Sequence, residues 1–562
     1  MDNPLLNISG LPPFSVIEPE HVEPAIDQLL SESRTLTEQL LDSNEAPTWD
    51  NLIEPLERMD DRINRAWSPV SHMNSVVNSD ALRQAYNACL PKLSDYATEM
   101  GQNEQLFAAY QAVAENDSNL NDHQKKVLKN ALRDFHLSGV DLPAEQKARF
   151  KAISQQLSEL TSQYSDNLLD ATNAWSKLIT DESELAGLPE SALALAKQTA
   201  EQREESGWIL TLEFPSYFPV MTYADNRELR EEMYTAYATR ASEQGPHAGQ
   251  WDNSELMEQI LKLRHEAAQL LGFDNYAERS LAKKMARNSD EVLGFLTDLA
   301  ERSHPQAQRE LDELKAFAQS EYGVTELDAW DIGYYAEKLR QHRYAITQEE
   351  LKPYFPEDRV LAGMFEVVKR LYGMQISELD NIDSWHPDVR FFEIRDRDQT
   401  LRGQFYLDLY ARPKKRGGAW MDECASRYVS NDYHQTPVAY LTCNFTPPVG
   451  DKPALFTHDE VETLFHEFGH GLHHMLTRID YPAIAGISGV AWDAVELPSQ
   501  FMENWCWERE ALDLISGHYE SGEPIPTELY EKMKAAKNFH SGMMMVRQLE
   551  FSLFDFRIHR EY

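Results

Sequence analysis

The sequence predicts a mainly α-helical protein that carries one small β-sheet. Over most of the first 390 residues, apolar side chains recur every three or four positions, the spacing that places them on one face of a helix. Glycine (24) and proline (27) are sparse among the 562 residues, which favours helices over turn-rich sheets. Strand signals are few and short. No fixed-period repeat is present, so a solenoid is not expected.

The clearest helical pattern runs from 146 to 170. Its apolar positions, separated by Lys, Glu, Gln and Ser, are Phe150, Ile153, Leu157, Leu160, Tyr164 and Leu168. The segment WILTLEF at 208–214 then predicts a strand. Similar helical spacing predicts further helices near 256–271 and 292–317.

The remaining strand signals lie in the last third of the chain. Residues 389–395 and 403–410 predict a hairpin, and PVAYLTCNF at 437–445 predicts another short strand. After a histidine-rich helix, the last residues still show helical spacing when the sequence stops, with no glycine cap or proline stop. We therefore expect the natural protein to continue beyond Tyr562.

Composition excludes several classes of function. With 42% hydrophobic residues and no run of 18 apolar positions, we expect a soluble globular protein without a transmembrane helix. The N-terminus lacks the features of a secretory or mitochondrial signal, and the four cysteines have no paired spacing, so we expect a reduced, cytoplasmic protein. The formal charge of −40 disfavours binding to nucleic acid or to a membrane. We expect a monomer.

The stretch TLFHEFGHGLHHM holds four of the chain's 18 histidines. Its predicted helix begins with a capping box, because Thr457 is followed three residues later by Glu460. At about 100° per residue, the apolar side chains fall in one arc, while His466, Glu467 and His470 fall in the opposite arc. One face of this helix therefore packs into a core, and the other gathers polar groups.

His466 and His470 are four residues apart, so their rings project from adjacent turns and can reach one metal ion. Glu467 lies slightly around the helix, where it can accept a proton from water at the metal. This is the arrangement of an H-E-x-x-H zinc site. The alternative, a solvated polar face that happens to carry histidines, fits less well with a capped helix that has an apolar back.

The third ligand is left open by the spacing. His473 is seven residues from His466, a rise of about 10.5 Å, so both reach one ion only if the helix breaks at Gly471. His473 is thus the less favoured alternative, and we expect a carboxylate from another element. Glu496 and Glu503 lie two turns apart in an apolar segment downstream, and spacing does not choose between them.

Two further roles are expected near this site. Asp493 or Glu503 is expected to hold a ligand imidazole by its second nitrogen, with ordinary helix capping an equal alternative for Asp493. The strand that ends at Cys443, Asn444 and Phe445 is expected to bind the backbone of a substrate as an added strand, provided that its edge is exposed.

Three motifs together resemble those of the thimet oligopeptidase family of zinc metallopeptidases. They are FHEFGHGLHH at 465–474, ELPSQFMENW at 496–505 and GQFYLDLYARPKKRGGAW at 403–420. The strand PVAYLTCNF is also similar to the segment before the zinc helix in that family, and the resemblance extends over the whole chain. It implies that His466, His470 and Glu496 bind one Zn²⁺ and that Glu467 is the general base.

The resemblance also implies a fold and an activity. The fold would be mainly α, with two largely helical halves around a deep substrate channel and a small β-sheet near the zinc helix. We accordingly expect an N-terminal helical region over 1–205 and a zinc peptidase catalytic region over 206–562. The implied activity is a zinc-dependent endopeptidase that hydrolyses internal bonds of short unstructured oligopeptides, including signal-peptide remnants.

One departure from the family concerns catalysis. Its members continue into a Gly- and Tyr-rich loop thought to stabilise the tetrahedral intermediate, and nothing in 1–562 matches that loop. We expect a C-terminally shortened chain of low activity, since losing one such donor typically costs about 10²–10³ in kcat. The alternatives are a carboxydipeptidase of the same family and a catalytically impaired form that binds zinc and peptide.

Overall fold

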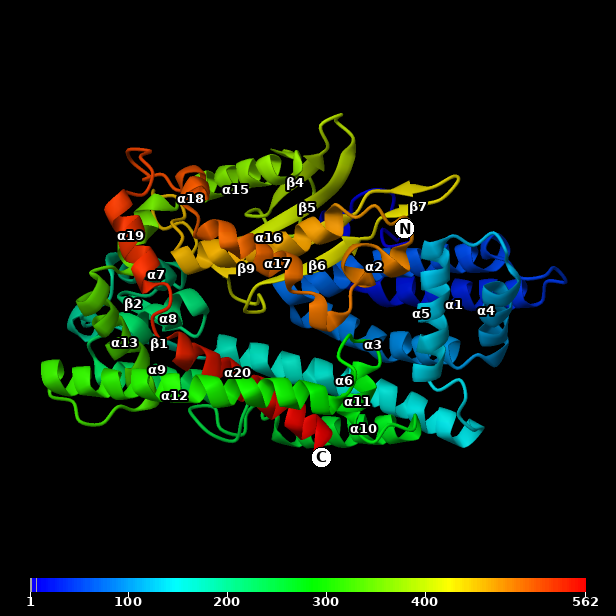
Figure 1. The fold of residues 1–562 in the computed structure, drawn as a ribbon, viewed down its shortest axis with the longest axis horizontal. Coiled ribbons are helices and arrows are strands. Elements are labelled where there is room, and N and C mark those ends of the chain that lie inside the picture. Colours follow the sequence, from blue (N-terminus) through cyan, green and yellow to red (C-terminus); the bar gives the residue numbers. More distant parts are fainter. Residues whose placement is uncertain (1–2, 7) are drawn as a thin grey trace.

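The computed structural model describes residues 3–6 and 8–562, and within them the chain is mainly helical, as predicted. Figure 1 shows helices at both ends of the long axis and along one long side, with the larger β-sheet on the opposite side. No helix in the described residues is both long and apolar enough to cross a membrane.

Six helices make up the N-terminal part of the molecule. Apolar side chains of the first three pack in one buried cluster that includes Ile26, Ile63 and Cys89. The helix predicted at 146–170 is the centre of the longer sixth helix. These helices are α1 (Pro19–Leu41), α2 (Glu54–Val76), α3 (Asp80–Gly101), α4 (Glu104–Asn116), α5 (Asp122–Leu137) and α6 (Ala144–Ala174).

The middle of the chain adds a two-stranded sheet and nine helices of varied length. The strand predicted at 208–214 is shorter than expected, because Phe214 begins a helix with Pro215 in its first turn, where no amide donor is needed. The helices predicted near 256–271 and 292–317 are confirmed as α10 and α12. The elements are β1 (Ser176–Ile179), α7 (Glu190–Gln202), β2 (Trp208–Thr211), α8 (Phe214–Tyr223), α9 (Arg227–Ala238), α10 (Ser254–Leu270), α11 (Tyr276–Leu281), α12 (Ser289–Tyr322), α13 (Ala329–Tyr344), α14 (Gln348–Leu351) and α15 (Glu357–Tyr372).

The boundary expected between an N-terminal region (1–205) and a catalytic region (206–562) lies between two strands that pair with each other. β1, on one side of it, pairs antiparallel with β2 on the other side. Both strands and α7 contribute to one apolar cluster, which includes Ile179, Ala196 and Leu210. Because this cluster is continuous, the structure does not separate two regions at that point.

Five strands form the larger sheet, in the spatial order β3-β4-β5-β9-β6. The predicted hairpin is confirmed, since β4 and β5 pair antiparallel with Phe391 opposite Tyr406. β9 pairs parallel with β5 and antiparallel with β6, so β9 is an inner strand and β6 an outer one. The strands are β3 (Gln375–Glu378), β4 (Arg390–Arg395), β5 (Leu401–Tyr410), β6 (Trp420–Ala425) and β9 (Val438–Phe445), with a separate pair β7 (Tyr428–Val429) and β8 (His434–Gln435).

β9 is buried on both faces, which explains its nearly continuous apolar sequence. Leu441 and Cys443 belong to the cluster that contains the histidine helix, whereas Tyr440 belongs to a second cluster with Phe14 and Tyr406. Alternate side chains of a strand point to opposite faces, so a strand covered on both sides needs apolar residues throughout.

The last part of the chain is helical again. α16, the histidine helix, lies across one face of the sheet and contacts β9 and β6 (Figure 1). The final helix packs along α12 on the far side of the molecule. These helices are α16 (His458–Met475), α17 (Leu497–Glu503), α18 (Arg509–Ile515), α19 (Thr527–Ala536) and α20 (Ser541–Arg560).

Candidate metal centre

The histidine helix begins with the predicted capping box. The Thr457 hydroxyl accepts a hydrogen bond from the Glu460 amide (3.1 Å), and the Glu460 carboxylate accepts one from the Thr457 amide (2.8 Å). The apolar arc of α16, which includes Phe465 and Phe468, is buried against the sheet. That burial orients the opposite, polar arc.

Three side chains converge at the polar arc. The Nε2 atoms of His466 and His470 lie 3.1 and 3.2 Å from Oε2 of Glu496. Ligand atoms bound at about 2.0–2.1 Å to a tetrahedral ion are separated by about 3.3 Å, which is close to these distances. Two imidazole nitrogens and one carboxylate oxygen are also a donor set that suits Zn²⁺. The three residues therefore fit a zinc ion.

Glu496 reaches this point because α17 begins very close to α16. A Cβ atom at Gly469 would stand 2.6 Å from both the Pro498 carbonyl oxygen and the Ser499 Cα, so only glycine leaves room there. The Ser499 hydroxyl lies 2.8 Å from Oε2 of Glu496 and 2.9 Å from its carbonyl oxygen, which orients the carboxylate. Sequence reasoning missed Gly469 and Ser499, although a glycine inside H-E-x-x-H was an available signal.

Glu503 and Asp493 have different surroundings. Oε1 of Glu503 lies 2.6 Å from Nδ1 of His466, and a hydrogen bond there leaves Nε2 of the ring free to face Glu496. Asp493 instead accepts hydrogen bonds from the amides of Met285 (3.0 Å) and Ala286 (2.9 Å). Because these backbone donors occupy its carboxylate, the structure does not place Asp493 as a partner of an imidazole.

His473 lies outside the converging group. α16 continues through Gly471 without a break, so His473 stays two turns from His466. The neighbouring His474 is buried and donates to the carbonyl oxygen of Ala425 on β6 (3.0 Å). His474 therefore belongs to the packing of α16 against β6.

Glu467 is buried beside the converging side chains. Burial raises its pKa to about 7, against the opposing effects of His466 and of a hydrogen bond from the Met421 amide. The residue expected as the base therefore lies next to β6 as well as next to the candidate ligands.

The substrate-binding role expected for Cys443, Asn444 and Phe445 stays a prediction. They end β9 beyond Thr442, the last residue that pairs with β6, and on the other side Phe445 pairs with Tyr410 of β5. Cys443 and Phe445 are buried, and the Asn444 side chain donates to the carbonyl oxygens of two loop residues, Arg416 (2.9 Å) and Gly418 (2.6 Å).

β3 and β6 are the two outer strands of the sheet, and β6 contacts the histidine helix α16. Ser68 on α2 donates to the Glu423 carbonyl (2.8 Å), so α2 covers the C-terminal half of this strand. The N-terminal half, Trp420–Asp422, includes Met421, whose amide lowers the pKa of Glu467, and β6 contacts α16. Sequence reasoning missed this edge, because the order of strands in a sheet is not a local property.

A cavity of about 930 Å³ lies between α2, α5, α11 and the segment 483–492. Its wall includes Trp492, four residues before Glu496, so it borders the segment that supplies the third converging side chain. Glu57 on α2 also lines it, and both of its carboxylate oxygens are buried without a hydrogen-bond partner among the described residues. Burial, together with the negative charge of Asp60, raises the pKa of Glu57 to about 8.

Two family models match this chain. Residues 220–562 match the model described as "Peptidase family M3", and residues 26–147 match "Neurolysin/Thimet oligopeptidase, N-terminal domain". The first match contains α16, α17 and the whole larger sheet.

Similar proteins cover the chain almost completely. It is 61% identical to "Oligopeptidase A" of Escherichia coli (strain K12), over 100% of this chain and 83% of that protein. It is 32% identical to "Dipeptidyl carboxypeptidase" of Salmonella typhimurium, over 99% of this chain and 82% of that protein. A solved structure, "PZ peptidase A with inhibitor 2", has a TM-score of 0.52 at 16% identity over 95% of this chain and 74% of its own, which shows a shared fold.

Proposed function

The chain belongs to peptidase family M3 and is a metalloendopeptidase similar to oligopeptidase A, and from this premise we propose that it hydrolyses internal bonds of short, unstructured oligopeptides with one Zn²⁺. Its substrates include remnants of cleaved signal peptides. The observation that carries the proposal is the convergence of His466, His470 and Glu496 on one point beside Glu467.

In this proposal the two Nε2 atoms and the Glu496 carboxylate hold the metal. Zinc bound there supplies Lewis-acid chemistry, which polarises a carbonyl group and lowers the pKa of water. Glu503 keeps the His466 ring oriented through Nδ1, so that Nε2 faces the ion. Ser499 does the same for the Glu496 carboxylate.

Glu467 moves the proton. Its carboxylate accepts a proton from the attacking water and delivers it to the nitrogen of the leaving amine. Its buried position beside Glu496 supports this role, because a base shielded from bulk water acts only on the water held at the site.

The free half of β6 binds the substrate backbone. An extended peptide that pairs with Trp420–Asp422 would lie next to Glu467, and backbone hydrogen bonds of this kind bind peptides with little regard to sequence. The cavity between α2, α5 and the segment 483–492 supports a channel between two largely helical halves. Such a channel admits short unstructured peptides and excludes folded proteins.

Measuring zinc content and peptide hydrolysis in single variants distinguishes the proposed base from the proposed metal ligands. Glu467→Gln should retain zinc and lose nearly all hydrolysis of an internally quenched fluorescent peptide, whereas His470→Gln should lose zinc as well. His473→Gln, on the same helix but outside the converging group, is the matched control and should keep both. Full hydrolysis by Glu467→Gln would end this mechanism.

The similarity to a dipeptidyl carboxypeptidase supports a second candidate, the release of dipeptides from C-terminal ends. Mass spectrometry of the products from a peptide blocked at its C-terminus distinguishes the two activities, because only an endopeptidase cleaves it internally. Zinc and peptide binding without any cleavage, measured by calorimetry, would indicate a non-catalytic form instead.

A further inference from the structure

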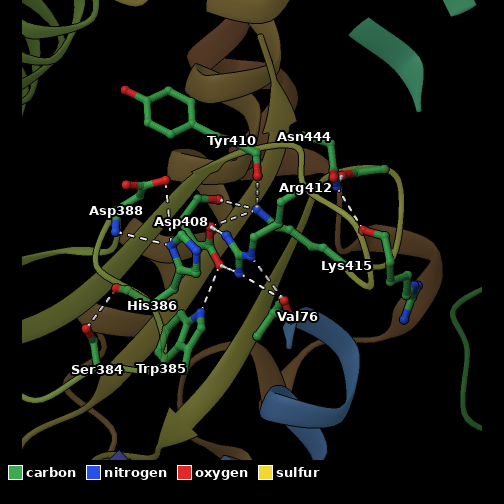
Figure 2. A network of polar contacts seen from close by, with 12 residues as sticks. Val76, Ser384, Trp385, His386, Asp388, Asp408, Tyr410, Arg412, Lys415 and Asn444 are labelled. Atoms are coloured by element: carbon green, nitrogen blue, oxygen red, sulfur yellow. Dashed lines mark hydrogen bonds and ion pairs between the residues drawn. The ribbon is translucent and has the colours of Figure 1, made fainter. Parts of the chain in front are cut away.

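A buried ion cluster lies at the C-terminal end of β5 and consists of Asp408, Arg412 and Lys415 (Figure 2). The Lys415 side chain is completely buried. Its ammonium group donates to Oδ1 of Asp408 (2.8 Å) and to the carbonyl oxygens of Asp408 (3.2 Å) and Tyr410 (2.7 Å). A lysine has three N–H donors, so all of them are used within this short stretch.

Both oxygens of the Asp408 carboxylate also accept hydrogen bonds. Arg412 donates to both of its oxygens, at 2.7 and 2.6 Å, and the Trp385 indole donates to Oδ2 at 2.9 Å. Burial would raise the pKa of Asp408, but the hydrogen bonds from Arg412 and the charge of Lys415 outweigh it and lower the pKa to about 2. Buried ion clusters add little net stability compared with apolar packing, so this one is better explained by the geometry that it specifies.

That geometry concerns the loop 411–419, which connects β5 to β6. Arg412 donates from Nε (3.2 Å) and Nη2 (3.0 Å) to the carbonyl oxygen of Val76, the last residue of α2 (Figure 2). The Arg416 amide donates to the Ser75 carbonyl (2.8 Å), and the Lys414 carbonyl accepts from the Asn78 amide (3.2 Å). The loop is therefore tied to the end of α2 by one side chain and by its own backbone.

The same loop leads directly into the free strand edge. Asn444 at the end of β9 donates to two of its carbonyl groups, which holds the loop over the sheet. β6 begins at Trp420 and contacts α16, the helix that carries Glu467. The position of this edge relative to the base is thus set by the anchoring of the loop.

We propose that Asp408, Arg412 and Lys415 are positioning residues that fix the N-terminal half of β6 for the substrate, without touching substrate or metal themselves. The inference rests on the proposed function, in which β6 binds the peptide backbone. Loss of the cluster should then weaken the binding of extended peptides more than it slows the chemical step.

Arg412→Lys is the most informative variant. A lysine keeps the charge, but its single ammonium cannot bridge both oxygens of Asp408 and also reach Val76. We expect KM for an extended quenched peptide to rise about tenfold, with kcat changed less than about threefold and zinc content unchanged. Arg402→Lys is the matched control, because Arg402 makes a similar two-bond pair with Asp396 at the other end of β5, and its kinetics should equal those of the wild type.

Amide hydrogen exchange supplies a readout that needs no activity. Arg412→Lys should speed exchange in fragments that cover 411–425 and leave 390–410 unchanged. Asp408→Asn, which removes the charge at constant shape, is the second variant and should behave in the same way. Unchanged KM and unchanged exchange in 411–425 would overturn this inference while leaving the proposed function intact, whereas full activity of Glu467→Gln would overturn the proposed function itself.

Discussion

The backbone of Ser499 lies so close to Gly469 that a Cβ atom at Gly469 would stand 2.6 Å from the Ser499 Cα. α16 and α17 meet at this contact, and Glu496, just before α17, is thereby brought to the two imidazoles. The candidate centre therefore depends on a glycine that offers no ligand atom of its own.

Gly469→Ala should weaken zinc binding. The added methyl group forces the start of α17 away, and a strain of about 1–3 kcal/mol at such a contact corresponds to a loss of about 5- to 150-fold in affinity. Competition with a zinc chelator measures this. Gly471→Ala is the control on the same helix, because its Cβ would meet only the ends of two flexible side chains, Leu441 at 3.0 Å and Met475 at 3.3 Å. Equal zinc affinity in the two variants would show that the α16–α17 contact is unimportant.

Glu503→Gln should reduce zinc affinity by about 10–100-fold, because the partner of a ligand imidazole sets its orientation and basicity. The observation behind this is the 2.6 Å distance between Oε1 of Glu503 and Nδ1 of His466. Asp493→Asn should leave zinc affinity unchanged, since Asp493 binds the amides before α12. If Asp493→Asn had the larger effect, the assignment of these two carboxylates would be reversed.

Glu57→Gln should stabilise the protein, and increasingly so as the pH rises. The pKa of Glu57 is raised from its ordinary value of 4.5 to about 8, so the folded state holds a proton that the unfolded chain has released. The wild type therefore loses stability as the pH rises from about 4.5 to 8, and the glutamine variant does not. We expect a gain of about 1–3 kcal/mol in the free energy of unfolding at pH 8.

Urea denaturation at pH 5 and pH 8 measures this difference. Glu45→Gln, at an exposed position, is the control and should change the free energy of unfolding equally at both values. A Glu57→Gln variant that is no more stable at pH 8 than at pH 5, relative to the wild type, would contradict the burial of an unpaired carboxylate in this cavity wall.

Thr457→Ala should destabilise the protein by about 1 kcal/mol, because it removes the hydroxyl that accepts from the Glu460 amide at the start of α16. Thr463→Ala, in the middle of the same helix, should cost clearly less, since that hydroxyl only donates back to the Asp459 carbonyl. Thermal unfolding of the two variants decides between these expectations.

Much of the fold could be predicted because it depends on local patterns. The helical spacing at 146–170 and the alternation at 389–410 both correspond to observed elements. The strand predicted at 208–214 was too long at its C-terminal end. The apolar pattern there favours a strand, but Phe214 begins a helix that has Pro215 in its first turn. Near 205 the pairing of β1 with β2 joins segments about thirty residues apart, a contact that local patterns do not indicate.

The helix face that carries His466, Glu467 and His470 could be predicted from the amino-acid sequence alone. Residues four apart on one helix are neighbours regardless of the tertiary structure around the helix. Spacing could not predict that Glu496 lies at these side chains, that Asp493 accepts from backbone amides, or that β6 is an outer strand of the sheet. These features depend on how closely α17 approaches Gly469 and on the order of strands in the sheet. Contacts between distant segments form only when the whole chain packs, and no spacing within a single segment encodes them.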